Sequence, residues 1–393
     1  MKITSVDVIK LKELVYSSQI PVLCRINTDE GIYGYGEAGV SIMNFTLGSY
    51  EILKLMSKSL IGRDPLDIDK IYYDLSHTFW AQGNGGVIMS AISAIDTALW
   101  DIKAKCFKVP LYKLLGGKHR DKLRCYASQL QNGWGYEEFM KAPGSIEFLT
   151  EACKKAVSEG YTAVKIDFTG KDADGKRLSA EMQRNWLTPD VLNLFEARVK
   201  AAREAVGPDV DIIMENHCNT SNITAVQFAK VAEKYNIMFL EEPCNPMSPE
   251  EHLKISQRTS IPVATGERTY TRWGYLPILS NGSVSVIQPD LGNCGGVTEG
   301  RKICDLAETF GVAVQTHTCN TPISVAVSLH LEAAIPNFII HEHHTVNTLK
   351  CVRDLCVYDY QPVNGYFEIP EIPGIGNELS QRALDEAQIE TIK

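Results

Sequence analysis

The 393-residue sequence predicts an α/β protein in which a parallel β/α barrel follows a smaller α+β domain. Two patterns in the chain support this fold class. Strand-like segments at the start are followed by helical ones, and after residue 118 short apolar runs repeat, each followed by a helix-like segment. The length also exceeds the size at which single cores usually stop growing, so two structural parts are expected.

The α+β domain is expected over residues 1–118. The first forty or so residues alternate as strands do, with a turn at residues 28–31 (Thr-Asp-Glu-Gly), which indicates a small antiparallel sheet. Residues 50–104 are mostly helical, and residues 91–102 place apolar side chains at intervals of three and four. The Leu-Leu-Gly-Gly at residues 114–117 ends the helical region.

Eight short apolar runs define the barrel, which is expected over residues 119–355. They are residues 123–128, 163–168, 210–217, 237–243, 261–267, 284–290, 312–317 and 338–344. Each run ends in polar residues, and from Glu215 to Glu342 the spacing from one run to the next is close to the length of one βα unit. The step from Lys165 to Glu215 is about twice as long, which indicates an inserted loop. A doubly wound open sheet is the competing architecture, but the Gly-x-Gly-x-x-Gly turn typical of it does not follow the first of these runs.

Composition restricts the possible partners and the compartment. The formal net charge is −9 and no long run of Lys or Arg occurs, so neither nucleic acid nor an anionic membrane surface is an expected partner. The 11 cysteines are scattered and never spaced as Cys-x-x-Cys, which favours a reducing cytoplasm over a disulfide framework or a thiolate zinc site. No export signal and no membrane span are expected.

Carboxylates end three successive runs of the predicted barrel: Glu215, Glu241 and Glu267. The C-terminal ends of barrel strands form the active-site face. One such Glu alone is more often a solvated strand end or a helix cap, but three at one register would repel one another without a cation. Because hard oxygen ligands suit Mg²⁺, the pattern predicts one bound Mg²⁺.

An acid–base pair is predicted beside this metal site. Asp290 and His317 end two successive runs, so a carboxylate can orient the imidazole and make it more basic. We therefore expect His317 to act as a catalytic base with Asp290 as its partner. Strand alternation places His217 on the same face as Glu215, and likewise places Asp167 with Lys165.

Substrate-binding groups are expected among the remaining polar residues at the strand ends. Lys165 and Arg268 are the cationic groups closest to the predicted site, although Lys165 could also be a surface ammonium. The run from His341 to His344 invites a zinc interpretation, but alternation divides it between two faces. Glu342 is the one expected to face the pocket, and the three imidazoles are expected to pack around it.

Several motifs together resemble the enolase superfamily, in particular its mandelate racemase branch, which includes galactonate and mannonate dehydratases. The resemblance runs nearly end to end. The motifs are Ala-Leu-Trp-Asp-Ile-Lys at 98–103, Leu-Leu-Gly-Gly at 114–117, Glu-Glu-Pro at 241–243, Gly-Glu at 266–267, Gln-Pro-Asp at 288–290 and Gly-Gly at 295–296.

The resemblance implies a modified (β/α)7β barrel covered by a capping domain, to which residues 356–393 return. It implies one Mg²⁺ per active site that holds the carboxylate of an acid sugar and stabilises the enediolate formed by loss of the α-proton. His317 matches the family's base, and His217 matches an acid that helps the 3-hydroxyl leave. The implied activity is that of an acid-sugar dehydratase of aldonate type, which forms a 2-keto-3-deoxy acid.

Two departures from the family keep other functions open. Glu215 stands where the family usually has Asp, and Asp167 stands where racemases and lactonising enzymes carry a second Lys. The second departure favours dehydration over an acid-sugar epimerase or racemase. A catalytically degenerate barrel that binds a sugar acid is the alternative from another class.

The capping loops are expected to set substrate specificity: residues 16–21, 40–47 and 80–86. Their uncharged character favours a monoacid. The expected partner is a small-molecule acid sugar, and a homo-oligomer is expected because symmetric assemblies are common.

Overall fold

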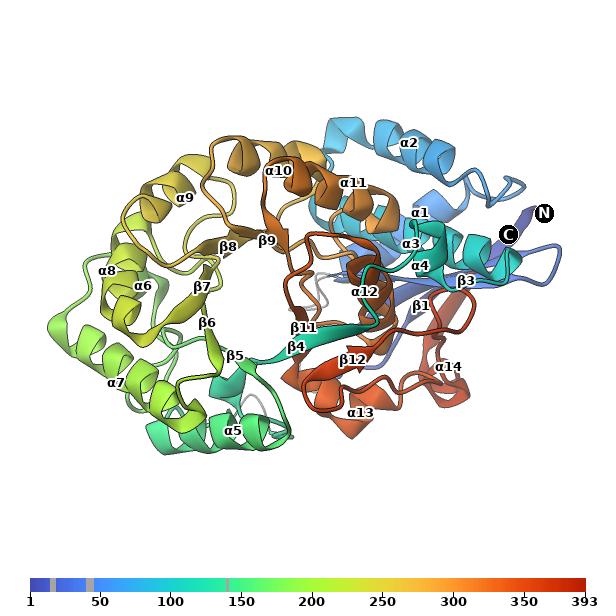
Figure 1. The fold of residues 1–393 in the computed structure, drawn as a ribbon. Helices are drawn as coiled ribbons and strands as arrows, with labels where there is room; N and C mark the ends of the chain where they lie inside the picture. The colour runs from blue at the N-terminus through green and yellow to red at the C-terminus, as the bar shows by residue number, and fades with distance from the viewer. Residues whose placement is uncertain (15–18, 40–45, 139–140) are drawn as a thin grey trace.

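The computed structural model describes residues 1–14, 19–39, 46–138 and 141–393, and Figure 1 shows a ring of strands and helices beside a smaller domain. The smaller domain holds a four-stranded antiparallel sheet in the order β13-β1-β2-β3. Its strands are β1 (Ile3–Lys10), β2 (Val22–Thr28), β3 (Tyr33–Ala38) and β13 (Gln388–Ile392). The turn predicted at residues 28–31 joins β2 to β3, where Gly31 donates to the carbonyl of Thr28 at 3.2 Å.

Helices follow this sheet along the chain as the sequence predicts, and α1 and α3 contact its strands. The helices are α1 (Thr46–Ser57), α2 (Ile68–Thr78), α3 (Gly86–Cys106) and α4 (Leu111–Leu114). Helix α3 crosses β3 so closely that side chains do not fit between them: a Cβ on Gly34 would lie 2.1 Å from the carbonyl oxygen of Ala98, and one on Gly36 would lie 1.9 Å from that of Ala94. Glycine at these two positions therefore lets the sheet and the helix pack directly.

The barrel consists of eight parallel strands in the order β10-β9-β8-β7-β6-β5-β4-β11, which confirms the eight predicted runs. A parallel bridge between Val314, at the end of β10, and Phe338, just before β11, joins the two ends of this curled sheet. The strands are β4 (Lys122–Ser128), β5 (Ala163–Ile166), β6 (Asp211–Glu215), β7 (Ile237–Glu241), β8 (Val263–Thr265), β9 (Val286–Ile287), β10 (Ala313–Val314) and β11 (His341–His344).

Each connection between successive barrel strands contains a helix, and these helices surround the ring in Figure 1. They are α5 (Ile146–Ser158), α6 (Ala180–Arg184), α7 (Pro189–Val206), α8 (Asn222–Ala232), α9 (Pro249–Ser256), α10 (Thr271–Ser280), α11 (Gly296–Thr309) and α12 (Pro322–Ala334). After β11 the described chain forms a 3₁₀ helix (Thr345–Thr348) and the short helix α13 (Lys350–Arg353) before it leaves the ring. The barrel is thus of the (β/α)7β type, as expected.

The segment 356–393 contacts both parts of the molecule. Strand β12 (Tyr366–Glu368) pairs antiparallel with β4 of the barrel. Helix α14 (Gln381–Glu386) follows it, and β13 then pairs antiparallel with β1 from Lys10 to Val6. The chain therefore returns to the capping sheet, while the boundaries at residues 118 and 355 stay predictions.

Buried hydrogen bonds attach the capping domain to the barrel. Asp96 of α3 accepts from the backbone N–H of Thr298, at the start of α11, at 2.8 Å. Glu37 of β3 accepts from the Thr321 hydroxyl and from the Ser324 hydroxyl, both at 2.7 Å, at the start of α12. Because a helix start in a βα unit follows the C-terminal end of a strand, these contacts hold the cap at the mouth of the barrel. Among the described residues, no helix is long and apolar enough to cross a membrane.

Candidate active site at the barrel mouth

The three predicted carboxylates converge at the mouth. Glu215 ends β6, Glu241 ends β7 directly opposite it in the strand register, and Glu267 follows β8 by two residues. One oxygen from each lies within 4.8 Å of one from each of the others, and all three side chains are buried. The register argument made from the sequence is confirmed by this geometry.

The chemistry of this group fits a divalent cation. The Oε2 atom of Glu241 is buried and has no hydrogen-bond partner among the described residues, and such an atom is costly unless a ligand satisfies it. Burial, and then the charge of Glu215, raise the pKa of Glu241 well above its usual value. A carboxylate-rich set of oxygen donors is what Mg²⁺ selects in proteins, so the residues present fit that ion.

Lys165 of β5 lies inside this acidic group. Its ammonium nitrogen is 2.5 Å from Glu241 Oε1, 2.9 Å from Glu342 Oε1 and 3.3 Å from Glu215 Oε2. Burial lowers the pKa of Lys165, but the charges of Glu241 and Glu342 outweigh burial and raise it well above its usual value. The lysine is therefore a buried cation, and the alternative of a surface ammonium is wrong.

Glu342 of β11 faces the barrel interior as predicted. It accepts from the Ser128 hydroxyl at 2.6 Å and from the backbone N–H of Thr318 at 3.0 Å. The neighbouring imidazoles of His341 and His343 pair elsewhere, with Glu332 and Tyr161 at 2.6 Å each. Among the described residues, the group whose ligand atoms lie close enough to hold a metal ion is Glu215, Glu241 and Glu267, and it contains no histidine. The structure therefore does not support a zinc site at residues 341–344.

The predicted contact between His317 and Asp290 is formed, while the role of His317 as a base stays a prediction. His317 Nδ1 lies 2.7 Å from Asp290 Oδ2, and the other ring nitrogen, Nε2, lies 3.4 Å from Glu267 Oε2. Burial lowers the pKa of His317, but interactions with Cys319, Glu267 and Asp290 raise it well above its usual value. The imidazole is thus oriented by one carboxylate, with its free nitrogen directed toward the acidic group.

A second Asp–His pair lies on the other side of the mouth. His217 Nδ1 is 2.9 Å from Asp167 Oδ2, and the φ of 46° at His217 turns the chain just after β6. Burial lowers the pKa of His217, but the charge of Glu215 and the hydrogen bond with Asp167 raise it to about 9. The sequence placed both residues at the mouth but did not predict this pairing. One sequence feature could have predicted it. Asp167 follows Lys165 by two positions and His217 follows Glu215 by two positions, and the strands β5 and β6 that carry these residues are neighbours.

Strand order places the two imidazoles across the barrel from each other. Between β6, which precedes His217, and β10, which precedes His317, lie three strands in one direction around the sheet (β7, β8 and β9) and three in the other (β5, β4 and β11). The carboxylates of Glu241 and Glu267 come from the strands between them. Two oriented imidazoles therefore flank one acidic centre.

Arg268 lies at the edge of this centre with 38% of its side chain exposed. It forms ion pairs with Glu267 and with Glu242. Glu242 is buried, and the sequence did not predict that it would lie at the site. Burial raises the pKa of Glu267, but Arg268 and His317 outweigh it and lower that pKa to about 2. Glu242 keeps a pKa raised to about 7, chiefly by burial and by the charge of Glu267.

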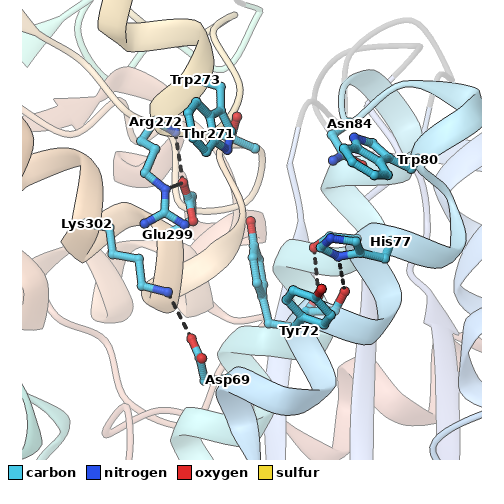
Figure 2. A pocket seen from close by; sticks show the side chains of 12 residues that line it. Asp69, Tyr72, His77, Trp80, Asn84, Thr271, Arg272, Trp273, Glu299 and Lys302 are labelled. Atoms are coloured by element: carbon cyan, nitrogen blue, oxygen red, sulfur yellow. Dashed lines mark hydrogen bonds and ion pairs between the residues drawn. The ribbon is translucent and has the colours of Figure 1, made fainter.

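The predicted specificity loops are only partly visible. Residues 16–18 and 40–45 lie outside the described residues. Trp80 and Asn84 of the third loop line a cavity of about 480 Å³ between α2 and the barrel helices α10 and α11 (Figure 2). Its charged walls pair with each other, Arg272 with Glu299 at 3.1 Å and Lys302 with Asp69 at 2.9 Å. None of the predicted site residues is among those that line it.

Comparison with protein families matches both parts of the chain. Residues 8–116 match the mandelate racemase / muconate lactonizing enzyme N-terminal domain, and residues 148–383 match the enolase C-terminal domain-like family. A solved structure of a member of the enolase superfamily from Salmonella Typhimurium superimposes with a TM-score of 0.95 at 45% identity and covers 100% of both chains.

Relatives that are named as dehydratases align with this chain over most of their length. The chain is 33% identical to the D-xylonate dehydratase of Haloferax volcanii over 371 residues, which are 94% of this chain and 85% of that protein. It is 31% identical to the D-galactonate dehydratase of Pectobacterium atrosepticum, with 92% and 89% covered. With its two-domain fold and its carboxylate centre, the chain belongs to the enolase superfamily, in the mandelate racemase and muconate lactonizing enzyme branch.

Proposed function

We propose that the protein is a Mg²⁺-dependent dehydratase of an acid sugar of aldonate type, which converts its substrate to a 2-keto-3-deoxy acid and water. The observation that carries the proposal is the pair of Asp-oriented imidazoles, His317 and His217, on opposite sides of the three-glutamate centre. The relatives named D-xylonate, D-gluconate and D-galactonate dehydratase support the same reaction class.

The three glutamates would hold the metal ion. Bound Mg²⁺ would supply Lewis-acid stabilisation of the negative charge that develops on the substrate carboxylate when the α-proton is removed. The fold contributes a site whose ligands come from three adjacent strand ends and are fixed before substrate arrives.

Proton transfer is assigned to the two imidazoles. His317, which Asp290 holds at 2.7 Å, would take the proton from the carbon next to the carboxylate through its free Nε2. His217 would then donate a proton to the 3-hydroxyl, so the C–O bond breaks and water leaves. The enol that results becomes the 2-keto-3-deoxy acid by gaining a proton at carbon 3 and losing the proton of the 2-hydroxyl, so the net change is the loss of one water.

Lys165, Glu342 and Arg268 are proposed to contact the substrate. Both cations already have carboxylate partners: Lys165 contacts Glu241 and Glu342, and Arg268 pairs with Glu267. Each can reach an anionic substrate by giving up one of these partners. Because Arg268 is partly exposed, this exchange is easier for Arg268 than for the buried Lys165.

An acid-sugar epimerase or racemase is the second candidate, and one observation favours it. Two oriented imidazoles on opposite faces could remove a proton from one side of a carbon and return one from the other. In D₂O such an enzyme would exchange the α-proton and invert the centre without forming a 2-keto acid, which separates it from a dehydratase.

A substrate screen tests the proposed function. The pure protein with Mg²⁺ would be incubated with a library of aldonates and aldarates, and 2-keto acid would be quantified by its semicarbazone. We expect turnover of at least one aldonate, none with a chelator present, and none with the variant His317→Asn. Mg²⁺-dependent sugar-acid binding without exchange or product would instead support the degenerate barrel.

A further inference from the structure

Three buried amide side chains come together at the mouth of the barrel. Asn320 follows β10 and Asn347 follows β11, the two strands at which the curled sheet closes. Residues that follow a barrel strand lie on the active-site face, so both amides are on that face. Gln19 is the third, and it belongs to the first of the predicted specificity loops of the capping domain. The exposed fractions of Gln19, Asn320 and Asn347 are 2%, 2% and 4%.

Two of these amides are held beside the third by their NH₂ groups. Gln19 Nε2 donates to the carbonyl of Cys319 at 3.4 Å, and Asn347 Nδ2 donates to the carbonyl of Asn320 at 2.9 Å. These carbonyls belong to the peptide units on either side of the Asn320 Cα atom, so the three side chains are grouped at one residue. A carbonyl only accepts, so the NH₂ groups of Gln19 and Asn347 face the main chain and their side-chain oxygens are left to accept elsewhere.

Four polar atoms of this group have no partner. They are Gln19 Oε1, Asn320 Oδ1, Asn320 Nδ2 and Asn347 Oδ1, each buried and without a hydrogen bond among the described residues. A buried polar group that stays unpaired lowers the stability of a protein, so each such group requires an explanation. The side chain of Asn320 contributes no hydrogen bond to the described structure, so the fold gives no reason for an amide at this position.

The loop that carries Asn320 is fixed between the proposed base and the cap. Before it in the chain, the thiol of Cys319 interacts with the imidazole of His317. After it, the backbone N–H of Thr321 donates to Glu37 of the capping sheet at 3.1 Å. These contacts do not involve substrate, so the position of Asn320 is set before substrate binds.

The unpaired atoms define the chemistry of a ligand. Three are oxygens that accept, and one is a nitrogen that donates. A hydroxyl both donates and accepts, so a chain of hydroxyls can satisfy all four atoms. A second carboxylate offers acceptors only, and in the described part of the chain these amides form no hydrogen bond with a Lys or Arg that could bind it. An ammonium offers donors only and leaves the NH₂ of Asn320 unpaired. The group therefore fits a neutral polyol.

We propose that Asn320, Gln19 and Asn347 form an amide subsite that binds hydroxyls of the sugar acid beyond carbon 3 and thereby selects an aldonate over the corresponding diacid. This inference rests on the proposed function, which places the substrate carboxylate at the three glutamates and carbon 2 at His317. The rest of the carbon chain then extends under the cap, past the loop that carries Asn320. An acid without these hydroxyls leaves the amides unpaired, so it binds more weakly.

The test combines changes in the protein with changes in the ligand. Calorimetry with Mg²⁺ present would give the Kd of wild type for D-xylonate, D-gluconate and D-galactonate. The aldonate that binds best would then be compared with its 4-deoxy and 5-deoxy analogues and with the matching aldarate. The same set would be measured with Asn320→Ala, with Gln19→Ala and with the control Asn193→Ala, at an exposed residue of α7. Calorimetry detects binding without turnover, so it reports on the subsite whether or not dehydration follows.

We expect wild type to bind the aldonate about tenfold or more tightly than at least one deoxy analogue and than the aldarate. Asn320→Ala should weaken binding of the aldonate by a similar factor. Its affinity for the sensitive deoxy analogue should stay within about twofold of wild type, because the partner hydroxyl is already absent. Gln19→Ala should show the same pattern, and Asn193→Ala should change no Kd. The unfolding temperature of Asn320→Ala without ligand should not fall, since this side chain has no hydrogen bond to lose.

Equal loss of affinity in Asn320→Ala for the aldonate and for every deoxy analogue would overturn the inference, because a structural defect does not depend on one hydroxyl. Unchanged affinity of Asn320→Ala for the aldonate would overturn it as well, and so would equal affinity of wild type for the aldonate and the aldarate. If the expected binding pattern is found but no 2-keto acid is formed, the proposed dehydration is refuted and the amide subsite is supported. Both fail if wild type binds no aldonate.

Discussion

Lys165 donates a hydrogen bond to Glu241 at 2.5 Å, and both side chains are buried at the mouth of the barrel. The substitution Lys165→Met removes the cation and leaves a group of buried carboxylates without compensation. We expect it to destabilise the metal-free protein by roughly 3–5 kcal/mol, the usual cost of breaking a buried ion pair. Urea unfolding measures this.

Mg²⁺ distinguishes this charge effect from a packing defect. Because the ion supplies positive charge to the same carboxylates, saturating Mg²⁺ should restore part of the stability of Lys165→Met and should help wild type less. A variant that is as stable as wild type without metal would contradict the compensating role of Lys165. Lys200→Met, an exposed lysine of α7, is the matched control.

Glu215→Ala should abolish both Mg²⁺ binding and turnover, because it removes one of the three converging oxygen donors. Glu215→Asp should keep measurable binding, since it retains the carboxylate at the same strand end. Calorimetric titration of the metal-free protein with Mg²⁺ gives the affinity without relying on activity. Glu204→Ala, an exposed residue of α7, should bind as wild type does; unchanged activity of Glu215→Ala would remove this residue from the site.

Asp290→Asn should lower the rate of α-proton exchange by about a thousandfold or more, because the amide no longer fixes the imidazole of His317 in the orientation and tautomer that a base needs. The measurement is deuterium incorporation in D₂O with Mg²⁺ present. His77→Asn, at an exposed histidine of α2, is the control for a substitution outside the site and should exchange the α-proton at the wild-type rate. Exchange at the wild-type rate in Asp290→Asn would show that another group is the base.

The buried carboxyl of Glu37 predicts a pH dependence of stability. Burial raises its pKa to about 7, although the Ser324 and Thr321 hydroxyls lower it. In the unfolded chain the pKa of a Glu is about 4.3. The folded state binds the proton more tightly, so this contribution is complete below about pH 4 and is lost as the pH rises toward 7.

Glu37→Gln should lack this dependence, because an amide does not titrate. Urea unfolding between pH 5 and 8 would therefore show a shallower decline with rising pH in Glu37→Gln than in wild type. Glu308→Gln, at an exposed position on α11, should follow the wild-type slope. Parallel slopes for wild type and Glu37→Gln would contradict the assignment.

Strand periodicity was sufficient to predict the barrel and most of its mouth. Glu215, Glu241 and Glu267 could be grouped because equivalent positions of successive βα units meet at one face, whatever the details of packing. The pairing of Asp290 with His317 followed from the same rule applied to adjacent units. Both predictions depend on the chain's repeat and not on the exact rotamer of any side chain.

Other contacts depend on rotamers and loop geometry, which periodicity does not specify. Asp167 meets His217 because the chain turns with a positive φ after β6, and no pattern in the sequence predicts that turn. The three carboxylate partners of Lys165 come from β6, β7 and β11, so its depth in the barrel depends on the whole set of strands. The contact between Gln129 and His217 is of the same long-range kind.

The pairing of β13 with β1 has a consequence for the order in which the protein is assembled. Strand β13 is synthesised after every barrel strand, and it occupies the edge of the capping sheet beside β1. On the ribosome the four-stranded sheet can therefore be completed only after the whole barrel has been translated. A nascent chain can therefore close its ring of strands first, and the cap over the mouth becomes complete only after that.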